Sequence, residues 1–316
     1  DNTIVQFIIG TDGKLYPVNT MNTSGVFPLS VATAGSFLFV ADTYQPLPTC
    51  STAAPCSGSI AVYPILTQAQ AAALTPAQPP DTLGPASVNT NISASYWPLT
   101  LPSAPTHVLT PTAITTGASG AYVYATAYDT SVSPTVGYVF GFSVNSDGTL
   151  SALAGSPFQT GTHPSAIASG PGGSNVFVTD FVNGVVYAYS ATGGVLSPVS
   201  GSPFATGNQP AAVAVNSAGS YVFVANSLDS NVTVYSSANG VLSSMGNYTT
   251  GTEPVAIGID PSSNEYLYTA NFLGNNVSGF QLNAATGTLL NSQYSPSPAN
   301  ANPTAVAAIP HGTPKK

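Results

Sequence analysis

The chain of 316 residues contains no arginine, and its three lysines are Lys14, Lys315 and Lys316. Charged residues make up 4% of the sequence and the formal net charge is −8, whereas ordinary soluble domains carry roughly 25% charged residues. Nucleic-acid binding needs Lys and Arg to neutralise phosphates, and anionic membrane surfaces attract the same cations. The composition therefore argues against both kinds of partner, and it leaves Ser, Thr, Asn and Gly to cover the surface.

Long apolar runs and helical periodicity are also missing. No run reaches the roughly 18 apolar residues of a membrane-spanning helix, and residues 67–74, TQAQAAAL, are the sole candidate for a helix, a short one. No signal peptide is present, yet the chain begins directly on a strand pattern, which suggests earlier processing. Hydrophobic residues still make up 43% of the chain, enough for a large core, so disorder is not expected.

Cysteine and histidine are scarce. Cys50 and Cys56 enclose the loop CSTAAPC, whose spacing favours a small disulfide and hence a compartment outside the cytosol; two free surface thiols are the alternative. His107, His163 and His311 are far apart and lack the spacing of metal ligands. We therefore expect no metal site and no cofactor, with a calcium ion held by aspartates of a central channel as the alternative.

What the chain does contain is a repeat of short strands. Three similar segments end in a proline that opens an apolar strand, SAIAS, AAVAV or VAIGI. The strands that follow, VFVTD, VFVAN and LYTAN, end on Asp180, Asn226 and Asn271, and a third and a fourth strand come after them. A period of 44 to 53 residues built from four strands is typical of a propeller blade.

The repeat predicts an all-β fold, a β-propeller of four-stranded blades in a single domain, residues 1–316. Between the first two repeats lie the cysteine loop, 50–56, and a Pro/Ala/Thr-rich stretch at about 67–105, which is either an insertion or a degenerate blade that would bring the total to seven. Six repeats are recognisable from the prolines that open strand one, namely Pro28, Pro111, Pro164, Pro210, Pro254 and Pro303.

The two ends of the chain predict one shared terminal blade. Residues 2–9 and 14–18 have the pattern of strands three and four, and residues 303–310 that of strand one. The equivalent of strand two is missing from both ends, and a blade without it exposes unpaired edges. Either residues before Asp1 are absent from the sequence, or a neighbouring chain supplies the strand, which is a known route to head-to-tail polymers.

The ends of the second strands carry a family resemblance. The segments 40–42 (VAD), 178–180 (VTD), 224–226 (VAN) and 269–271 (TAN) resemble the YVTN-type motif of the lactonase-like seven-bladed β-propellers. That family includes 6-phosphogluconolactonase-like enzymes and many secreted or surface proteins of unassigned activity. Phosphorylated lactones need cationic anchors, so a chain without Arg departs from those enzymes.

Two sets of residues are expected at the mouth of the central channel. His163 as general base, with Glu253 or Asp180 as orienter or acid, is the sharpest catalytic hypothesis for a lactonase. The alternative, which the sequence favours, is that the Asp and Asn side chains satisfy backbone groups of turns. The residues before the prolines are Phe27, Thr110, His163, Gln209, Glu253 and Asn302, and those at the ends of strand two are Asp42, Asp129, Asp180, Asn226 and Asn271.

Taken together, these features favour a secreted structural or surface protein that assembles with itself, into filaments by strand donation, over an enzyme. The first alternative is a lactonase-like hydrolase of a neutral lactone, and the second is a propeller that binds a glycan or a surface protein at the channel mouth. Glycosylation is a further expectation at the Asn-x-Ser/Thr sites, which are Asn22, Asn91, Asn231, Asn247 and Asn276.

Overall fold

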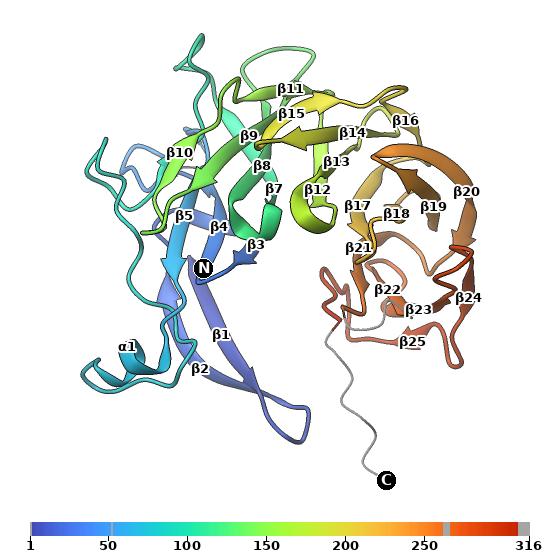
Figure 1. Ribbon diagram of the computed structural model, residues 1–316, viewed down its shortest axis with the longest axis horizontal. Coiled ribbons are helices and arrows are strands. Elements are labelled where there is room, and N and C mark those ends of the chain that lie inside the picture. Colours follow the sequence, from blue (N-terminus) through green and yellow to red (C-terminus); the bar gives the residue numbers. More distant parts are fainter. Residues whose placement is uncertain (1, 52, 262–265, 309–316) are drawn as a thin grey trace. The chain divides into compact units, whose positions relative to one another are not determined.

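The computed structural model describes residues 2–51, 53–261 and 266–308, and antiparallel β-sheet dominates it (Figure 1). It divides into two compact units, residues 1–158 and 159–316. Consecutive strands pair in chain order within each sheet, and five sheets have the four strands of a propeller blade. The predicted all-β propeller architecture is therefore confirmed, while the count of seven blades and the single-domain organisation stay predictions.

The first unit contains a hairpin and two blades. The hairpin consists of β1 (Thr3–Ile9) and β2 (Leu15–Asn22). The first blade consists of β3 (Val26–Ala34), β4 (Phe37–Tyr44), β5 (Ser59–Pro64) and β6 (Trp97–Pro98). The second consists of β7 (Leu109–Gly117), β8 (Tyr122–Asp129), β9 (Val136–Val144) and β10 (Leu150–Ala152), with a 3₁₀ turn at Ala118–Gly120.

The second unit contains three blades, and β11 (Phe158–Thr160) spans the boundary. The third blade consists of β12 (Pro164–Ser169), β13 (Asn175–Asp180), β14 (Val185–Thr192) and β15 (Val195–Pro198), with a 3₁₀ turn at Pro171–Gly173 and the short β16 (Phe204–Ala205). The fourth consists of β17 (Pro210–Val215), β18 (Tyr221–Asn226), β19 (Asn231–Ala238) and β20 (Val241–Thr249). The fifth consists of β21 (Pro254–Ile259), β22 (Tyr266–Asn271), β23 (Asn276–Leu282) and β24 (Leu289–Asn291), with the short β25 (Ser297–Pro298).

The second strand of each blade forms the centre of the core. In β18 all six residues are buried, because the strand has a neighbour on either edge and a neighbouring sheet on its faces. Such strands are rich in the β-branched and aromatic residues that fit a pleated, buried surface. Within each unit the first strands of successive blades also lie against one another: β3 on β7, and β17 on both β12 and β21.

Tight turns join strands three and four of the second and fourth blades. Gly148 and Gly240 have φ of 83° and 85°, and Asn239 has φ of 52°. A tight hairpin needs positive φ at these positions, which Gly and Asn adopt at low cost. The Asp147-Gly148 and Asn239-Gly240 dipeptides therefore suit the hairpins that contain them.

The stretch 67–105 forms no four-stranded sheet of its own. It contains the predicted short helix, α1 (Gln68–Ala72), where Thr67 and Gln70 form a reciprocal capping box. It then returns through β6 as the fourth strand of the first blade, paired with β5. The indole of Trp97 anchors this return by donating to the Leu150 carbonyl oxygen at 3.0 Å. Within the described ranges, no helix is long and apolar enough to cross a membrane.

Three of the predicted strand starts are wrong. The strand β3 begins at Val26, two residues before the expected Pro28. The strand β7 begins at Leu109, two residues before the expected Pro111, and Pro111 lies opposite Ala127. Thr110 is consequently inside a strand and not in the loop before it. Residues 303–308, predicted as strand one of a terminal blade, are assigned to no strand, and 309–310 lie outside the described residues.

Candidate functional site

The blades share a buried polar residue at the end of the second strand. In the third blade Asp180 lies opposite Pro164, the first residue of strand one. The remaining blades repeat this pairing, with Asn226 opposite Pro210, Asn271 opposite Pro254, Asp42 opposite Pro28 and Asp129 opposite Leu109. All five strand-end side chains are at most 1% exposed, so each needs polar partners inside the protein.

A glycine makes room for these side chains in four of the five blades. It stands three residues before the strand-one partner, in the sequences GVFP (25–28), GTHP (161–164), GNQP (207–210) and GTEP (251–254). A Cβ atom at Gly161 would collide with the Asp180 carboxylate, and one at Gly207 would collide with the Asn226 side chain. The G-x-x-P segment therefore lets the chain pass directly over the strand-end residue.

In the third blade this contact saturates the aspartate. Asp180 accepts hydrogen bonds from the backbone N–H groups of Thr162 at 2.5 Å, Val182 at 3.0 Å and Asn183 at 3.0 Å. Burial opposes the charge, but these bonds outweigh it and hold the pKa of Asp180 below its usual value. The Asp180 carboxylate therefore satisfies backbone groups of a turn, as the alternative interpretation of the sequence predicts.

The histidine of the same blade meets Asp180 through its backbone. The His163 N–H donates weakly to Asp180 Oδ2 at 3.4 Å, and the imidazole packs beside the Phe181 ring. Burial lowers the pKa of His163, and the Asp180 charge offsets part of that shift. Glu253 belongs to the fifth blade, where its carbonyl oxygen accepts from the Phe272 N–H and its own N–H donates to Ser230 Oγ. The catalytic roles proposed for His163, Glu253 and Asp180 stay predictions.

The second blade departs from this pattern. Its segment 106–109 reads THVL, so Thr106 replaces the glycine and His107 occupies the place of Thr162. His107 Nδ1 lies 2.6 Å from Asp129 Oδ2, and the exposed fractions of the two side chains are 33% and 2%. Asp129 Oδ1 accepts from the Ser131 N–H at 2.8 Å. The aspartate thus binds the imidazole where its counterpart binds backbone.

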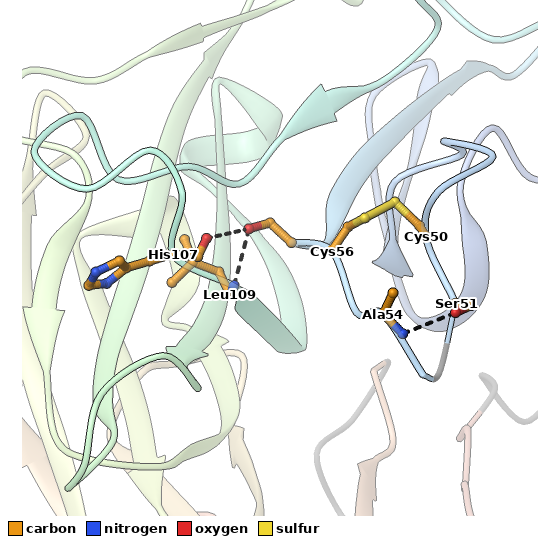
Figure 2. The surroundings of a disulfide bond; sticks show 7 residues. Cys50, Ser51, Ala54, Cys56, His107 and Leu109 are labelled. Atoms are coloured by element: carbon orange, nitrogen blue, oxygen red, sulfur yellow. Dashed lines mark hydrogen bonds between the residues drawn. A yellow bond between two sulfur atoms is a disulfide. The ribbon is translucent and has the colours of Figure 1, made fainter.

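The disulfide loop is connected to this histidine through the residue that follows Cys56. Cys50 and Cys56 form the predicted disulfide, with an S–S distance of 2.02 Å. The next residue, Ser57, donates its hydroxyl to the His107 carbonyl oxygen at 2.9 Å and accepts from the Leu109 N–H at 3.1 Å. Figure 2 shows this bridge and the imidazole of His107 projecting away from the disulfide.

A tyrosine completes the group. Tyr138 lies opposite Ala127, two residues from Asp129 on the same face of the sheet. Burial and the charge of Asp129 both raise the pKa of the half-buried Tyr138, so its phenol keeps its proton at neutral pH. The second blade therefore combines a histidine bound to the Asp129 carboxylate with a protonated tyrosine, Tyr138, on the same face of the sheet as that carboxylate.

Sequence reasoning missed His107 because the repeats were aligned on their prolines. That alignment placed Thr110 in front of strand one and left His107 without a role. The signal was nevertheless present, since THVL is the segment that lacks the glycine among the five four-stranded blades. When the repeats are aligned on the strand-one residue that lies opposite the strand-end aspartate, His107 is two residues before Leu109, the partner of Asp129.

Comparison with known proteins bears on this architecture. Residues 194–307 match the family model described as Lactonase, 7-bladed beta-propeller. The resemblance to the lactonase-like β-propellers is confirmed. No curated protein matches the chain significantly.

Solved structures share the fold of this chain. A candidate 6-phosphogluconolactonase from Bacteroides fragilis superposes with a TM-score of 0.70 at 19% identity, over 96% of this chain and 79% of its own. The periplasmic gluconolactonase of Pseudomonas aeruginosa gives 0.67 at 16% identity, over 95% and 79%. A functionally unknown protein from Desulfotomaculum acetoxidans gives 0.65 at 14% identity, over 98% and 83%.

The first blade contains a second unusual carboxyl group. Asp42 is fully buried, and neither of its oxygens makes a hydrogen bond, nor does the hydroxyl of Ser59, which lies opposite it. Burial raises the pKa of Asp42 to about 7, although the nearby Thr23 and Gly25 lower it in part. At neutral pH this carboxyl is therefore close to half protonated.

Metal ligands and glycosylation sequons are two further classes of candidate site. Among the described residues, no three His, Cys, Asp or Glu side chains gather as metal ligands. The sequons differ in environment: Asn22, Asn91 and Asn247 are exposed, whereas Asn231 and Asn276 are half-buried and accept hydrogen bonds from Asn226 and Asn271.

Proposed function

We propose that this lactonase-like propeller hydrolyses a neutral lactone, with His107 as general base and Asp129 as its orienting partner. The observation that carries the proposal is the 2.6 Å contact between His107 Nδ1 and Asp129 Oδ2 in a group with a partly exposed imidazole. The family match supports this enzymatic alternative better than it supports a structural role.

The pair is suited to acyl chemistry. In this mechanism Nδ1 donates its proton to Asp129, and Nε2 keeps its lone pair. Nε2 takes a proton from water as the water oxygen bonds to the lactone carbonyl carbon, and Asp129 stabilises the imidazolium that forms. The ring C–O bond then breaks, and the leaving oxygen takes the proton from Nε2. The Tyr138 hydroxyl supplies a donor for the negative charge on the carbonyl oxygen.

The substrate is expected to carry no negative charge. The chain has no arginine, and Lys14 pairs with Asp12 at 3.6 Å within the hairpin turn. A net charge of −8 also repels anions at long range. The 6-phosphogluconolactonase activity indicated for one structural neighbour therefore does not fit this chain, whereas an uncharged sugar or aliphatic lactone does.

The test compares matched histidine variants on a panel of neutral lactones. We expect His107→Gln and Asp129→Asn to lower kcat/KM by at least ~100-fold, and the control His163→Gln to retain the rate, with circular dichroism verifying the fold of each. If the native protein opens no neutral lactone, or His107→Gln keeps the full rate, the proposal is wrong.

Self-assembly by strand donation is a second candidate, which the hairpin β1–β2 favours. Phe7, Ile8, Ile9 and Leu15 are between 46% and 62% exposed on this two-stranded sheet. Exposed apolar strands with free edges are sites of pairing between chains. Electron microscopy and sedimentation of the native protein test this: filaments that Phe7→Asp/Ile9→Asp disperses support it, and monodisperse particles reject it.

We also propose that the protein acts outside the cytoplasm, at the cell surface or beyond. The Cys50–Cys56 disulfide supports this, because such bonds persist in oxidising compartments. Binding of a glycan or a surface protein stays a prediction of the sequence.

A further inference from the structure

We infer that Ser57, held in place by the adjoining disulfide, is a positioning residue for the His107 base. The inference rests on the proposed lactonase function and assigns a role to the cysteine loop, which that function does not otherwise use. Ser57 does not contact the imidazole; it acts on the backbone that carries it.

The first step is the hydroxyl bridge. Ser57 Oγ donates to the His107 carbonyl oxygen and accepts from the Leu109 N–H, so one side chain fixes the two peptide groups that flank Val108. Ser57 is 7% exposed, and a buried hydroxyl that loses such partners is costly to leave unpaired. The bridge therefore holds His107 at a set distance from the strand start at Leu109.

The second step is the contact next to it. The Gly58 N–H donates to the Leu109 carbonyl oxygen at 2.8 Å, and the Gly58 carbonyl oxygen accepts from the Leu99 N–H at 2.9 Å. A Cβ at Gly58 would collide with the Pro111 ring. Residue 58 is thus pressed against the start of β7 with no space for a side chain.

The third step is the opposite side of the same segment. The Val108 N–H donates to Ser131 Oγ at 2.8 Å, and the Thr130 N–H donates to the Val108 carbonyl oxygen at 3.0 Å. Because Ser131 also donates its N–H to Asp129, this side ties the segment to the aspartate. His107 is therefore fixed between the Asp129 turn and Ser57, and removing Ser57 frees one side only.

The disulfide limits how far Ser57 can move. It closes the loop one residue before Ser57, and the loop adds its own bonds, such as the Gln45 N–H to the Ser57 carbonyl oxygen at 3.1 Å. A closed loop has fewer conformations than an open one. Reduction should therefore loosen Ser57 and, through it, the contact between His107 and Asp129.

The experiment uses the full chain with ¹⁵N-labelled histidine, whose three imidazoles are resolved by NMR and assigned by substitution. In Ser57→Ala we expect the His107 Nδ1–H resonance to broaden or shift, the pH profile of kcat to move, and kcat to fall roughly 10- to 100-fold with KM within about twofold. Ser57→Thr keeps the hydroxyl and should restore both readouts. Ser156→Ala is the matched control, since Ser156 Oγ accepts the Gly141 N–H elsewhere in the unit, and it should change neither.

Because Ser57→Ala could impair folding, the native protein is also reduced with a phosphine and examined in the same way. An unchanged His107 signal in both the variant and the reduced protein overturns the inference. So does an equal loss in Ser156→Ala, because the effect would then be general. If the native protein opens no lactone, the proposed function fails, while the NMR readout still decides whether Ser57 positions His107.

Discussion

The second and third blades contain the same residue types, but their strand-end aspartates bind different partners. Each has a buried aspartate at the end of strand two, a tyrosine on the same face and a histidine before strand one. In the third blade Asp180 is occupied by backbone N–H groups and His163 packs on Phe181. In the second blade Asp129 binds the His107 imidazole.

The difference comes from the residue three positions before the strand-one residue that lies opposite the aspartate, which is Gly161 in the third blade and Thr106 in the second. Gly161 lets the backbone approach Asp180 closely enough to donate to it, whereas Thr106 has a side chain at that place. The Asp180 carboxylate already accepts from backbone N–H groups and from the Asn183 side-chain amide, which leaves little capacity for an imidazole. The comparison shows that the presence of Asp, His and Tyr in one blade does not define a site; the partner of the carboxylate does.

The largest expected effect follows from converting the second blade into the third. The double variant Thr106→Gly/His107→Thr restores the glycine and supplies the threonine that stands before His163. We expect lactone hydrolysis to fall by at least ~100-fold with the fold retained, measured by steady-state kinetics beside thermal unfolding. Retained turnover would place the catalytic base elsewhere.

The first blade extends the comparison, because Asp42 has neither a backbone nor a histidine partner. Its pKa is about 7 in the folded protein against 3.8 in the unfolded chain, so the folded state holds the proton more tightly. Stability from this group is full below about pH 4 and is lost as the pH rises towards and through 7. We expect Asp42→Asn to raise the free energy of unfolding at pH 8 by about 2–4 kcal/mol and by much less at pH 4.

Asp180→Asn is the matched control for that experiment. The pKa of Asp180 is lowered, so its contribution is present above its unfolded value and is lost as the pH falls through the folded one. Denaturant titrations at several pH values should show opposite trends for the two variants. Parallel trends would contradict the different roles assigned to the two carboxyls.

A smaller effect is expected from filling the glycine space in the third blade. In Gly161→Ala the new methyl group meets the Asp180 carboxylate, which we expect to cost about 1–3 kcal/mol of stability. Thr106→Ala, at the corresponding position of the second blade, should cost less than half as much. Equal losses in chemical denaturation would contradict the particular role given to the glycine of the third blade.

The smallest effect separates the two tyrosines. Tyr138→Phe removes the hydroxyl near Asp129, and we expect kcat to fall about tenfold, less than the roughly 100-fold or more that follows loss of a main oxyanion donor. Tyr187→Phe removes its counterpart beside Asp180 and should leave kcat unchanged. Equal rates in both variants would remove Tyr138 from the mechanism.

Most of the fold was predictable because it repeats. Four short strands, their Asp-Gly and Asn-Gly turns and the Cys50–Cys56 loop follow from local sequence chemistry. The start of β7 did not, since Leu109 extends that strand beyond its proline through pairing with Asp129, which no local pattern reveals. The site was missed for the same reason: His107 and Asp129 are 22 residues apart, and their contact depends on register across the sheet.

The G-x-x-P segment has a consequence for how such proteins diversify. The third and fourth blades bond their strand-end aspartate or asparagine to the backbone of this segment, whereas the second blade lacks the glycine and has an imidazole contact instead. The structural copies preserve the fold, while a single copy is free to vary. In a repeat protein of this kind, a new side-chain contact needs neither a new strand nor a new loop. Substitution of a few residues in one repeat is enough, while the other repeats keep the fold.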